Sequence, residues 1–303
     1  MAGQNERNDK QEHFDHDGLW KDLVERFWRE LLQLCIPDLY ADADLSREPE
    51  FLDKELRAII SMPGEDEHNF ARFVDELMKI YLKNGDEQWI LLHIEIQGPG
   101  GEDISIRMVS YCCLIYCHRH IEPVALAILT SPRPKEKLGT YEASRYGTHH
   151  IYCYNYFELY NQDDDALLRS DNPLELALYA AKKAVLCRNE EMQKLKYLRE
   201  LTRLLNKKGW SEKDRRDILI FIARFINLKD RKFQLQYIKD VQEMKGEGNM
   251  AEATFIENYF RDEGIKSMAV GMAHEGIPTN VIARVAKKDV HIVERWISEG
   301  SKA

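Results

Sequence analysis

Long apolar runs are absent from this sequence, as is an apolar segment near its first residue, and each absence disfavours one class of protein. No apolar stretch approaches the ~20 residues that a helix needs to cross a bilayer. The first residues, from Met1 to Lys10, are polar and contain no apolar segment of the kind found in a signal peptide. We therefore expect a cytoplasmic protein without membrane contact.

Cysteine is also sparse, with six residues in a chain of 303. Without a secretion signal, these cysteines are expected to be reduced thiols rather than a disulfide framework. Five metal-binding side chains lie together in a segment of helical pattern: Cys112, Cys113, Cys117, His118 and His120. A zinc site is one interpretation. The segment lacks a second ligand pair at zinc spacing, so buried small side chains are the preferred interpretation.

Positive charge is in deficit, because the formal net charge is −9 at pH 7. This balance disfavours a protein that coats DNA by bulk attraction, although it leaves room for a local basic surface. One region is clearly basic, and its cations are Lys182, Lys183, Arg188, Lys194, Lys196, Arg199, Arg203, Lys207, Lys208, Lys213, Arg215 and Arg216. A DNA-contacting surface and an ordinary solvated helical face both fit this region.

The residues that are present indicate a soluble globular chain, with 44% hydrophobic and 31% charged residues. Apolar periodicity and Pro and Gly positions predict its elements. The predicted helices cover 16–36, 105–120, 173–187, 188–207, 211–228 and 231–245, and the predicted strands cover 38–45, 51–60, 73–97 (as a hairpin), 124–130 and 150–160. This order favours an α/β fold, in which a mixed central sheet flanked by helices is followed by an all-helical C-terminal region. We predict a disordered tail at 1–15, an α/β domain at 16–170, a helical region at 171–245 and a helical tail at 246–303.

The hairpin at residues 73–97 carries the most informative pattern. Asn84-Gly85 is a strong turn signal, because both residues tolerate positive φ. A reversal centred at Gly85 pairs residues whose numbers add up to 170, so Asp75 is expected opposite Glu95. In the second strand, one face then carries Trp89, Leu91, His93, Glu95 and Gln97, and the other carries Ile90, Leu92, Ile94 and Ile96. Opposed residues have Cβ atoms about 5 Å apart, so the two carboxylates would meet where a divalent cation neutralises both.

This arrangement, an Asp followed on the next strand by Glu-x-Gln, resembles the active site of the PD-(D/E)XK nuclease superfamily. The motifs that come in the matching order are His16-Asp17-Gly-Leu-Trp-Lys21, Phe51-Leu-Asp-Lys-Glu-Leu56, the Asp75 strand, His93-Ile-Glu-Ile-Gln-Gly98, Arg107-Met-Val-Ser-Tyr111 and Ala125-Leu-Ala-Ile-Leu-Thr130. Together they resemble the bacterial recombination-promoting nuclease (Rpn) family over roughly the first 190 residues. The resemblance implies a restriction-endonuclease-like fold and DNA cleavage that promotes recombination, in connection with mobile elements or phage defence. A separate set of three widely spaced acids of the RNase H-like type is not evident, which disfavours a transposase.

The chemistry that follows is hydrolysis of DNA phosphodiesters with Mg²⁺ or Mn²⁺. Asp75 and Glu95 would supply metal-binding oxygens, the backbone carbonyl of Ile96 a third, and Gln97 would orient the attacking water or the phosphate. Most members of the superfamily carry lysine where this chain has Gln97. Because glutamine has no positive charge to lower the pKa of water, we expect a slow enzyme.

Other residues are weaker candidates for the same site. Lys79 shares the Asp75 face at a distance that suits a neighbouring phosphate, and His93 shares the Glu95 face, where a structural imidazole is the preferred interpretation. Glu30, with Glu25 as its rival, is the candidate for an additional helical acid. A helix would place Arg107 and Tyr111 on one face, where they could brace the site or touch the DNA backbone.

The C-terminal segment resembles a degenerate helix-turn-helix, with Ile282-Ala283 in its first helix and 290–297 as the recognition-helix candidate. Three short helices packed together without DNA contact would give the same pattern. Because cleavage of both DNA strands needs two sites, we also expect a homodimer. The alternative function is a nuclease-fold protein that no longer cuts and acts by binding DNA or protein.

Overall fold

The structure is a computed structural model that describes residues 16–60, 73–95, 103–130, 138–187, 190–244 and 249–301. The chain forms two compact units. One unit is Trp20–Lys182, and the other combines Met1–Leu19 with Lys183–Ala303. The division between them falls within α6 (Pro173–Leu186), and the predicted domain limits remain predictions.

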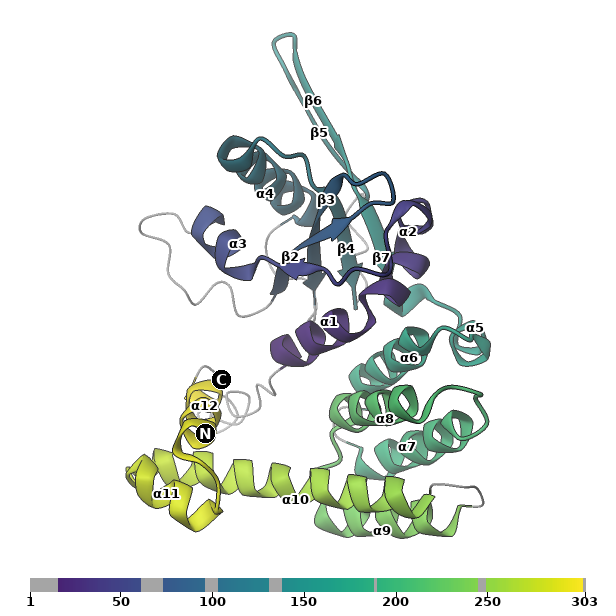
Figure 1. The fold of residues 1–303 in the computed structure, drawn as a ribbon, viewed down its shortest axis with the longest axis vertical. Coiled ribbons are helices and arrows are strands. Elements are labelled where there is room, and N and C mark those ends of the chain that lie inside the picture. The colour runs from purple at the N-terminus through teal and green to yellow at the C-terminus, as the bar shows by residue number, and fades with distance from the viewer. Residues whose placement is uncertain are drawn as a thin grey trace, which may run out of the picture. The chain divides into compact units, whose positions relative to one another are not determined.

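The first unit contains a five-stranded mixed sheet (Figure 1). Its strands, in spatial order, are β1 (Glu50–Phe51), β2 (Phe73–Tyr81), β3 (Glu87–Glu95), β4 (Val124–Leu129) and β7 (Asn155–Glu158). β1, β2 and β3 pair antiparallel, whereas β3, β4 and β7 pair parallel. The predicted α/β class with a mixed sheet is therefore confirmed.

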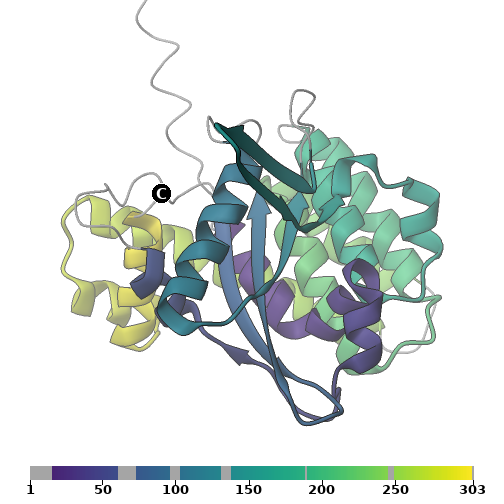
Figure 2. The ribbon, with the colours of Figure 1, turned by 90° about the horizontal axis from the view of Figure 1, so that it is seen from above.

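Helices cover both faces of this sheet. α1 (His16–Cys35) lies on one face, where the ammonium of Lys21 comes within 3.9 Å of the buried Glu76 carboxylate on β2. α3 (Asp53–Ile60) and α4 (Ile104–Arg119) pack on the other face, against Leu77 and Leu91. Figure 2 shows α1 and α4 on opposite sides of the strands. Burial from both sides explains why β3 and β4 are almost continuously apolar.

Two predicted strands are helices in the structure. Residues 38–45 were predicted as a strand, but α2 (Pro37–Asp42) begins with Pro37 at its first turn, where the missing N–H of proline costs no hydrogen bond. Residues 51–60 contribute only Phe51 to the two-residue strand β1 and then form α3. The apolar residues Leu52, Leu56 and Ile59 recur at helical spacing and pack in the core beneath α4, so burial of one helical face decides the outcome.

The predicted strand at 150–160 is two strands that belong to different sheets. β5 (Thr140–Arg145) and β6 (Thr148–Cys153) form a separate two-stranded arm that projects from the unit (Figure 1). At Tyr154 the chain leaves the arm, the Tyr154 side chain is buried, and its N–H donates to the carbonyl of Gly139. β7 then follows and pairs with β4, and the turn η2 (Leu159–Asn161) and helix α5 (Asp164–Arg169) come after it.

The second unit is helical among its described residues. Its helices after α6 are α7 (Glu191–Leu205), α8 (Glu212–Ile226), α9 (Arg231–Glu243), α10 (Asn249–His274), α11 (Thr279–Ala286) and α12 (Val290–Ser301). The predicted helices at 173–245 are thus confirmed within a few residues. Side-chain caps fix two of the starts, because Ser211 accepts from the N–H of Asp214 and Asp230 accepts from that of Lys232. In the described part of the chain, no helix combines the length and apolarity that a membrane span requires.

Candidate functional site

The turn between β2 and β3 sets the geometry of the candidate site. The N–H of Leu82 donates to the carbonyl of Asp86 at 2.8 Å, which closes a loop over residues 83–85. Gly85 has φ +93°, while Asn84 uses its side chain to accept from the N–H of Asp86 at 2.9 Å. A three-residue loop with glycine in the last position is a standard hairpin connection.

This loop corrects the predicted register by two residues. Asp75 lies opposite His93, and Glu95 lies opposite Phe73, so the expected pairing of Asp75 with Glu95 is wrong. The error arises because the reversal is centred at Asn84 and only Gly85 of the Asn-Gly pair takes positive φ. A shift of two residues preserves the face, since strand residues alternate sides. Positions 75, 93 and 95 therefore share one face, with 75 and 95 as diagonal neighbours about 7–8 Å apart.

Position 95 lies where two parallel strands end. Glu95 is the last residue of β3, and it is level with Leu129 at the end of β4 and, through it, with Glu158 at the end of β7. The carboxyl ends of neighbouring parallel strands are the usual place for ligand binding in open α/β sheets. Ile96, Gln97 and the side chains of Asp75 and Glu95 lie outside the described part of the structure.

Helix α4 brings two predicted residues over this sheet face. Its buried residues Ile104, Met108 and Tyr111 pack in the same core as Ala127 and Leu129. Arg107 is 7% exposed, and its guanidinium carbon lies 5.2 Å from the ring centroid of Tyr111. The predicted pairing of these two side chains on one helix face is confirmed.

His93 is central to this face and is fully buried. It lies between Asp75 on β2 and Ala127 on β4 in the strand register. A buried imidazole in the middle of a sheet has a structural role whatever else it does, because its polar ring atoms must be accommodated within the core.

Lys79 is engaged elsewhere. Its ammonium lies 2.9 Å from Glu50 and 3.5 Å from Glu87, at the turn end of the hairpin. The hydrogen bond to Glu50 is the main cause of the raised pKa of Lys79. The predicted phosphate contact therefore competes with two carboxylates that already hold this side chain.

Glu30 and Glu25 belong to α1, which packs against the opposite face of the sheet from positions 75, 93 and 95. Glu25 is exposed, and Glu30 is partly exposed, with its backbone carbonyl accepting from the Asn172 side chain at 3.0 Å. The structure thus does not bring the helical acids together with the predicted site.

One acid that sequence reasoning missed shares the site face. Glu158 pairs with Leu129, which in turn pairs with Glu95, so all three positions face the same side of the sheet. The hydroxyl of Tyr160 donates to the Glu158 carboxylate. Two strand spacings separate Glu158 from Glu95, about 10 Å, which suits a contact with substrate rather than with one shared cation. No motif marks Glu158, and only the sheet order reveals it.

The cysteine segment does not form the alternative zinc site. Cys112 is buried, with its sulfur 2.6 Å from the hydroxyl of Tyr152, and burial raises the pKa of its thiol to about 11. Cys113 and Cys117 are exposed on the outer side of α4. Among the described residues, no three His, Cys, Asp or Glu side chains come together in a metal-binding group.

Several cations of the predicted basic region are neutralised within the fold. Ion pairs join Lys182 to Asp164, Lys194 to Glu191, Arg199 to Asp240 and Arg216 to Glu212, at N–O distances of 2.5–2.9 Å. Lys183 is buried with its ammonium 5.8 Å from the ring centroid of Tyr197, and Arg188 lies outside the described residues. The region is therefore not one continuous field of free positive charge.

Comparison of the chain with family models, with curated proteins and with solved structures gives no match.

Proposed function

We propose that the chain is a metal-dependent DNA endonuclease with a restriction-endonuclease-like domain of the kind that its motifs resemble. The observation that carries the proposal is the register of β2 and β3, because it puts positions 75 and 95 on one sheet face. The same face meets α4, and position 95 ends a strand that is parallel to its neighbour β4. Helix, antiparallel hairpin, helix and parallel strand follow in the order that the resemblance implies.

The donor set at these positions suits Mg²⁺ or Mn²⁺. Both are hard cations that prefer oxygen ligands, and Asp75, Glu95 and the Ile96 carbonyl offer only oxygens. Diagonal neighbours on a sheet face remain within reach of long side chains, so the corrected register still permits joint binding. When bound, such a cation lowers the pKa of a coordinated water and neutralises charge on the phosphate.

The remaining tasks fall to the protein itself. Gln97 holds the water or a phosphate oxygen by hydrogen bonds, with its amide as donor and acceptor. Arg107 belongs to α4, which packs on this face, and it supplies positive charge near the substrate. Because this chain has Gln97 where most members of the superfamily have lysine, we expect slow turnover. Since two strands need two cuts, we expect the active species on duplex DNA to be a homodimer.

The test is a nicking assay on supercoiled plasmid with Mg²⁺, with Mn²⁺ and with EDTA, alongside calorimetric titration with Mn²⁺. Asp75→Asn and Glu95→Gln remove one charge each at nearly constant volume. We expect each substitution to abolish calorimetric Mn²⁺ binding and to slow nicking by at least about a hundredfold. Substitution of residues that only hydrogen-bond to metal ligands already lowers metal affinity or activity about 10–100-fold.

Glu87→Gln is the matched control, since Glu87 lies on the same strand and has the same parity as Glu95 but sits at the turn end. It should nick like the parent chain. Nicking that survives in EDTA or in both site variants would refute the proposal. DNA retention without any nicking would instead favour the alternative, a nuclease-fold protein that only binds.

A further inference from the structure

The last three helices form a small subdomain with its own core. Ala269 from α10, Ile282 and Ala283 from α11, and Val293 from α12 are buried together. Met272, Ile277, Trp296 and Ile297 pack around them. This core fixes the orientation of α12 relative to α11, so the exposed side of the pair has a defined shape.

The connection between α11 and α12 is as short as in helix-turn-helix proteins. It comprises residues 287–289, and Lys287 takes a left-handed conformation with φ +53° that ends α11. The N–H of Lys288 donates to the carbonyl of Ala283 at 3.1 Å and tightens the turn. A three- to four-residue turn between two helices is the connection by which a second helix is presented to a DNA groove.

The exposed face of α12 is polar apart from Val290, its first residue, which is 39% exposed. His291, Glu294, Arg295 and Ser298 recur at helical spacing and are exposed, whereas Val293 faces the core. These side chains include donors and acceptors of the types that hydrogen-bond to base edges.

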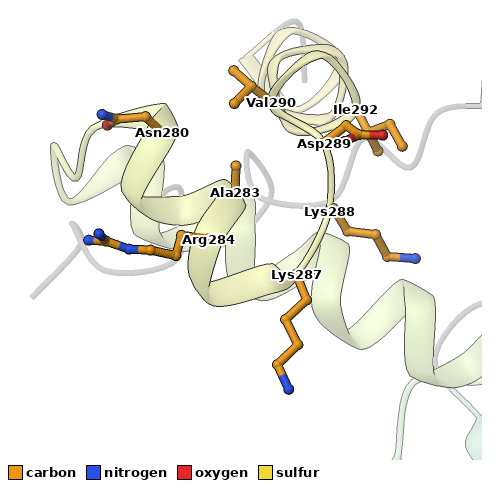
Figure 3. A pocket seen from close by; sticks show the side chains of 8 residues that line it. All are labelled: Asn280, Ala283, Arg284, Lys287, Lys288, Asp289, Val290 and Ile292. Carbon is orange, nitrogen blue, oxygen red and sulfur yellow. The ribbon is translucent and has the colours of Figure 1, made fainter.

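A concavity of about 540 Å³ lies beside this face, between the end of α11 and the start of α12 (Figure 3). Arg284, Lys287 and Lys288 line it, with Asp289 as its acid. Lys288 pairs with Asp262 of α10 at 3.2 Å. Arg284 and Lys287 extend outward in Figure 3, and within the described residues neither forms an ion pair or a side-chain hydrogen bond. Two cations, one on the first helix and one on the turn that follows it, are thus free to contact an anion.

We propose that α11 and α12 form a binding surface for double-stranded DNA. Arg284 and Lys287 contact backbone phosphates, as the first helix of a helix-turn-helix crosses the backbone, and the polar face of α12 enters the major groove. This surface belongs to the second unit and does not depend on the metal-binding positions of the first. Its DNA binding therefore persists without metal.

The experiment measures the fluorescence anisotropy of a labelled 30-base-pair duplex of mixed sequence with the full chain in EDTA. The variant is Arg284→Ala combined with Lys287→Ala, two exposed positions whose substitution leaves the helix core intact. We expect its affinity to fall roughly tenfold or more at low salt. Because each phosphate contact contributes a slope of about −0.9 to the salt dependence, the parent should lose about twelvefold more affinity than the variant between 50 and 200 mM salt.

Lys196→Ala combined with Lys213→Ala is the charge-matched control, because both residues are exposed cations of the basic region. The control should bind as the parent does, and so should Asp75→Asn, which separates this proposal from the nuclease proposal. Equal DNA affinity of the parent and of the variant lacking Arg284 and Lys287 would overturn the proposal, as would an equal loss of affinity in the control. If the variant lacking Arg284 and Lys287 lost self-association while its DNA binding was unchanged, the surface would be assigned to a second copy of the chain instead.

Discussion

Replacement of Gly85 by alanine tests the hairpin turn on which the candidate site depends. Gly85 has φ +93°, and a Cβ built on it meets no atom within 4 Å. The added methyl group therefore causes no steric clash, and the cost is that of the backbone conformation alone. For a residue with a Cβ in the left-handed region, this cost is about 1–2 kcal/mol.

The expected series distinguishes backbone strain from other effects. Gly85→Ala should lower the free energy of unfolding by about 1–2 kcal/mol, and Gly85→Asn should lower it less, since asparagine tolerates positive φ better than alanine does. Gly209→Ala is the matched control, because its Cβ also meets no atom within 4 Å but its φ is not positive. At such a position alanine is neutral or stabilises by about 0.4–1 kcal/mol through the unfolded state.

Urea unfolding followed by circular dichroism gives the stability changes, and Mn²⁺ calorimetry reports on the site. A two-residue Asn-Gly loop would change the register by one residue and move position 75 to the other face from position 95. Backbone strain at Gly85 would be refuted as the cause if Gly85→Ala were as stable as the parent, or if the Gly209 control lost as much stability. The first result would mean that the positive φ of Gly85 costs alanine nothing, and the second that the loss of stability is not specific to a position with positive φ.

Three further outcomes follow from individual contacts. Burial opposes ionisation of Glu191, but hydrogen bonds from two backbone N–H groups and from Lys194 lower its pKa below the ordinary 4.5. The ionised carboxylate therefore contributes its full stabilisation above pH about 4.5. This stabilisation is lost as the pH falls through the lower pKa of the folded state. Glu191→Gln should cost about 2 kcal/mol at pH 7, less than a fully buried pair because the side chain is partly exposed, and should flatten the acid limb of a stability curve measured between pH 3 and 7. Thiol alkylation followed by mass spectrometry at pH 8 should modify exposed Cys117 well before Cys112, whose pKa of about 11 keeps it protonated. Lys79→Ala should leave plasmid nicking unchanged and cost less than about 1 kcal/mol, because its partners are half exposed.

The sequence predicts long elements better than short ones, for a physical reason. The helices α7, α8 and α9 span 13–15 residues, with many apolar residues at the helical period, so their type follows from the pattern alone. α2 and α3 span six and eight residues, which is too few to separate a period of 2 from one of 3.6. Their conformation is decided by packing against distant residues.

In the candidate site, too, local features are predicted from the sequence and long-range features are not. Alternation within β3 correctly puts His93 and Glu95 on one face, because it is a local property of a strand. The register between β2 and β3 depends on whether Asn84 or Gly85 takes positive φ, and both residues tolerate it. Glu158 joins the face only through β4, and the neutralisation of Lys182 depends on Asp164, so long-range pairing rather than local pattern determines both.

The passage of β6 directly into β7 through Tyr154 has a mechanical consequence. A load applied at the tip of the arm is shared by β5 and β6, and the part that β6 carries runs straight into β7 and shears the four residue pairs that join β7 to β4. The β2–β3 hairpin is separated from β7 by β4 in the sheet order. The part of the load that β6 carries would therefore act on the pairing of β7 with β4 before it reached positions 75 and 95.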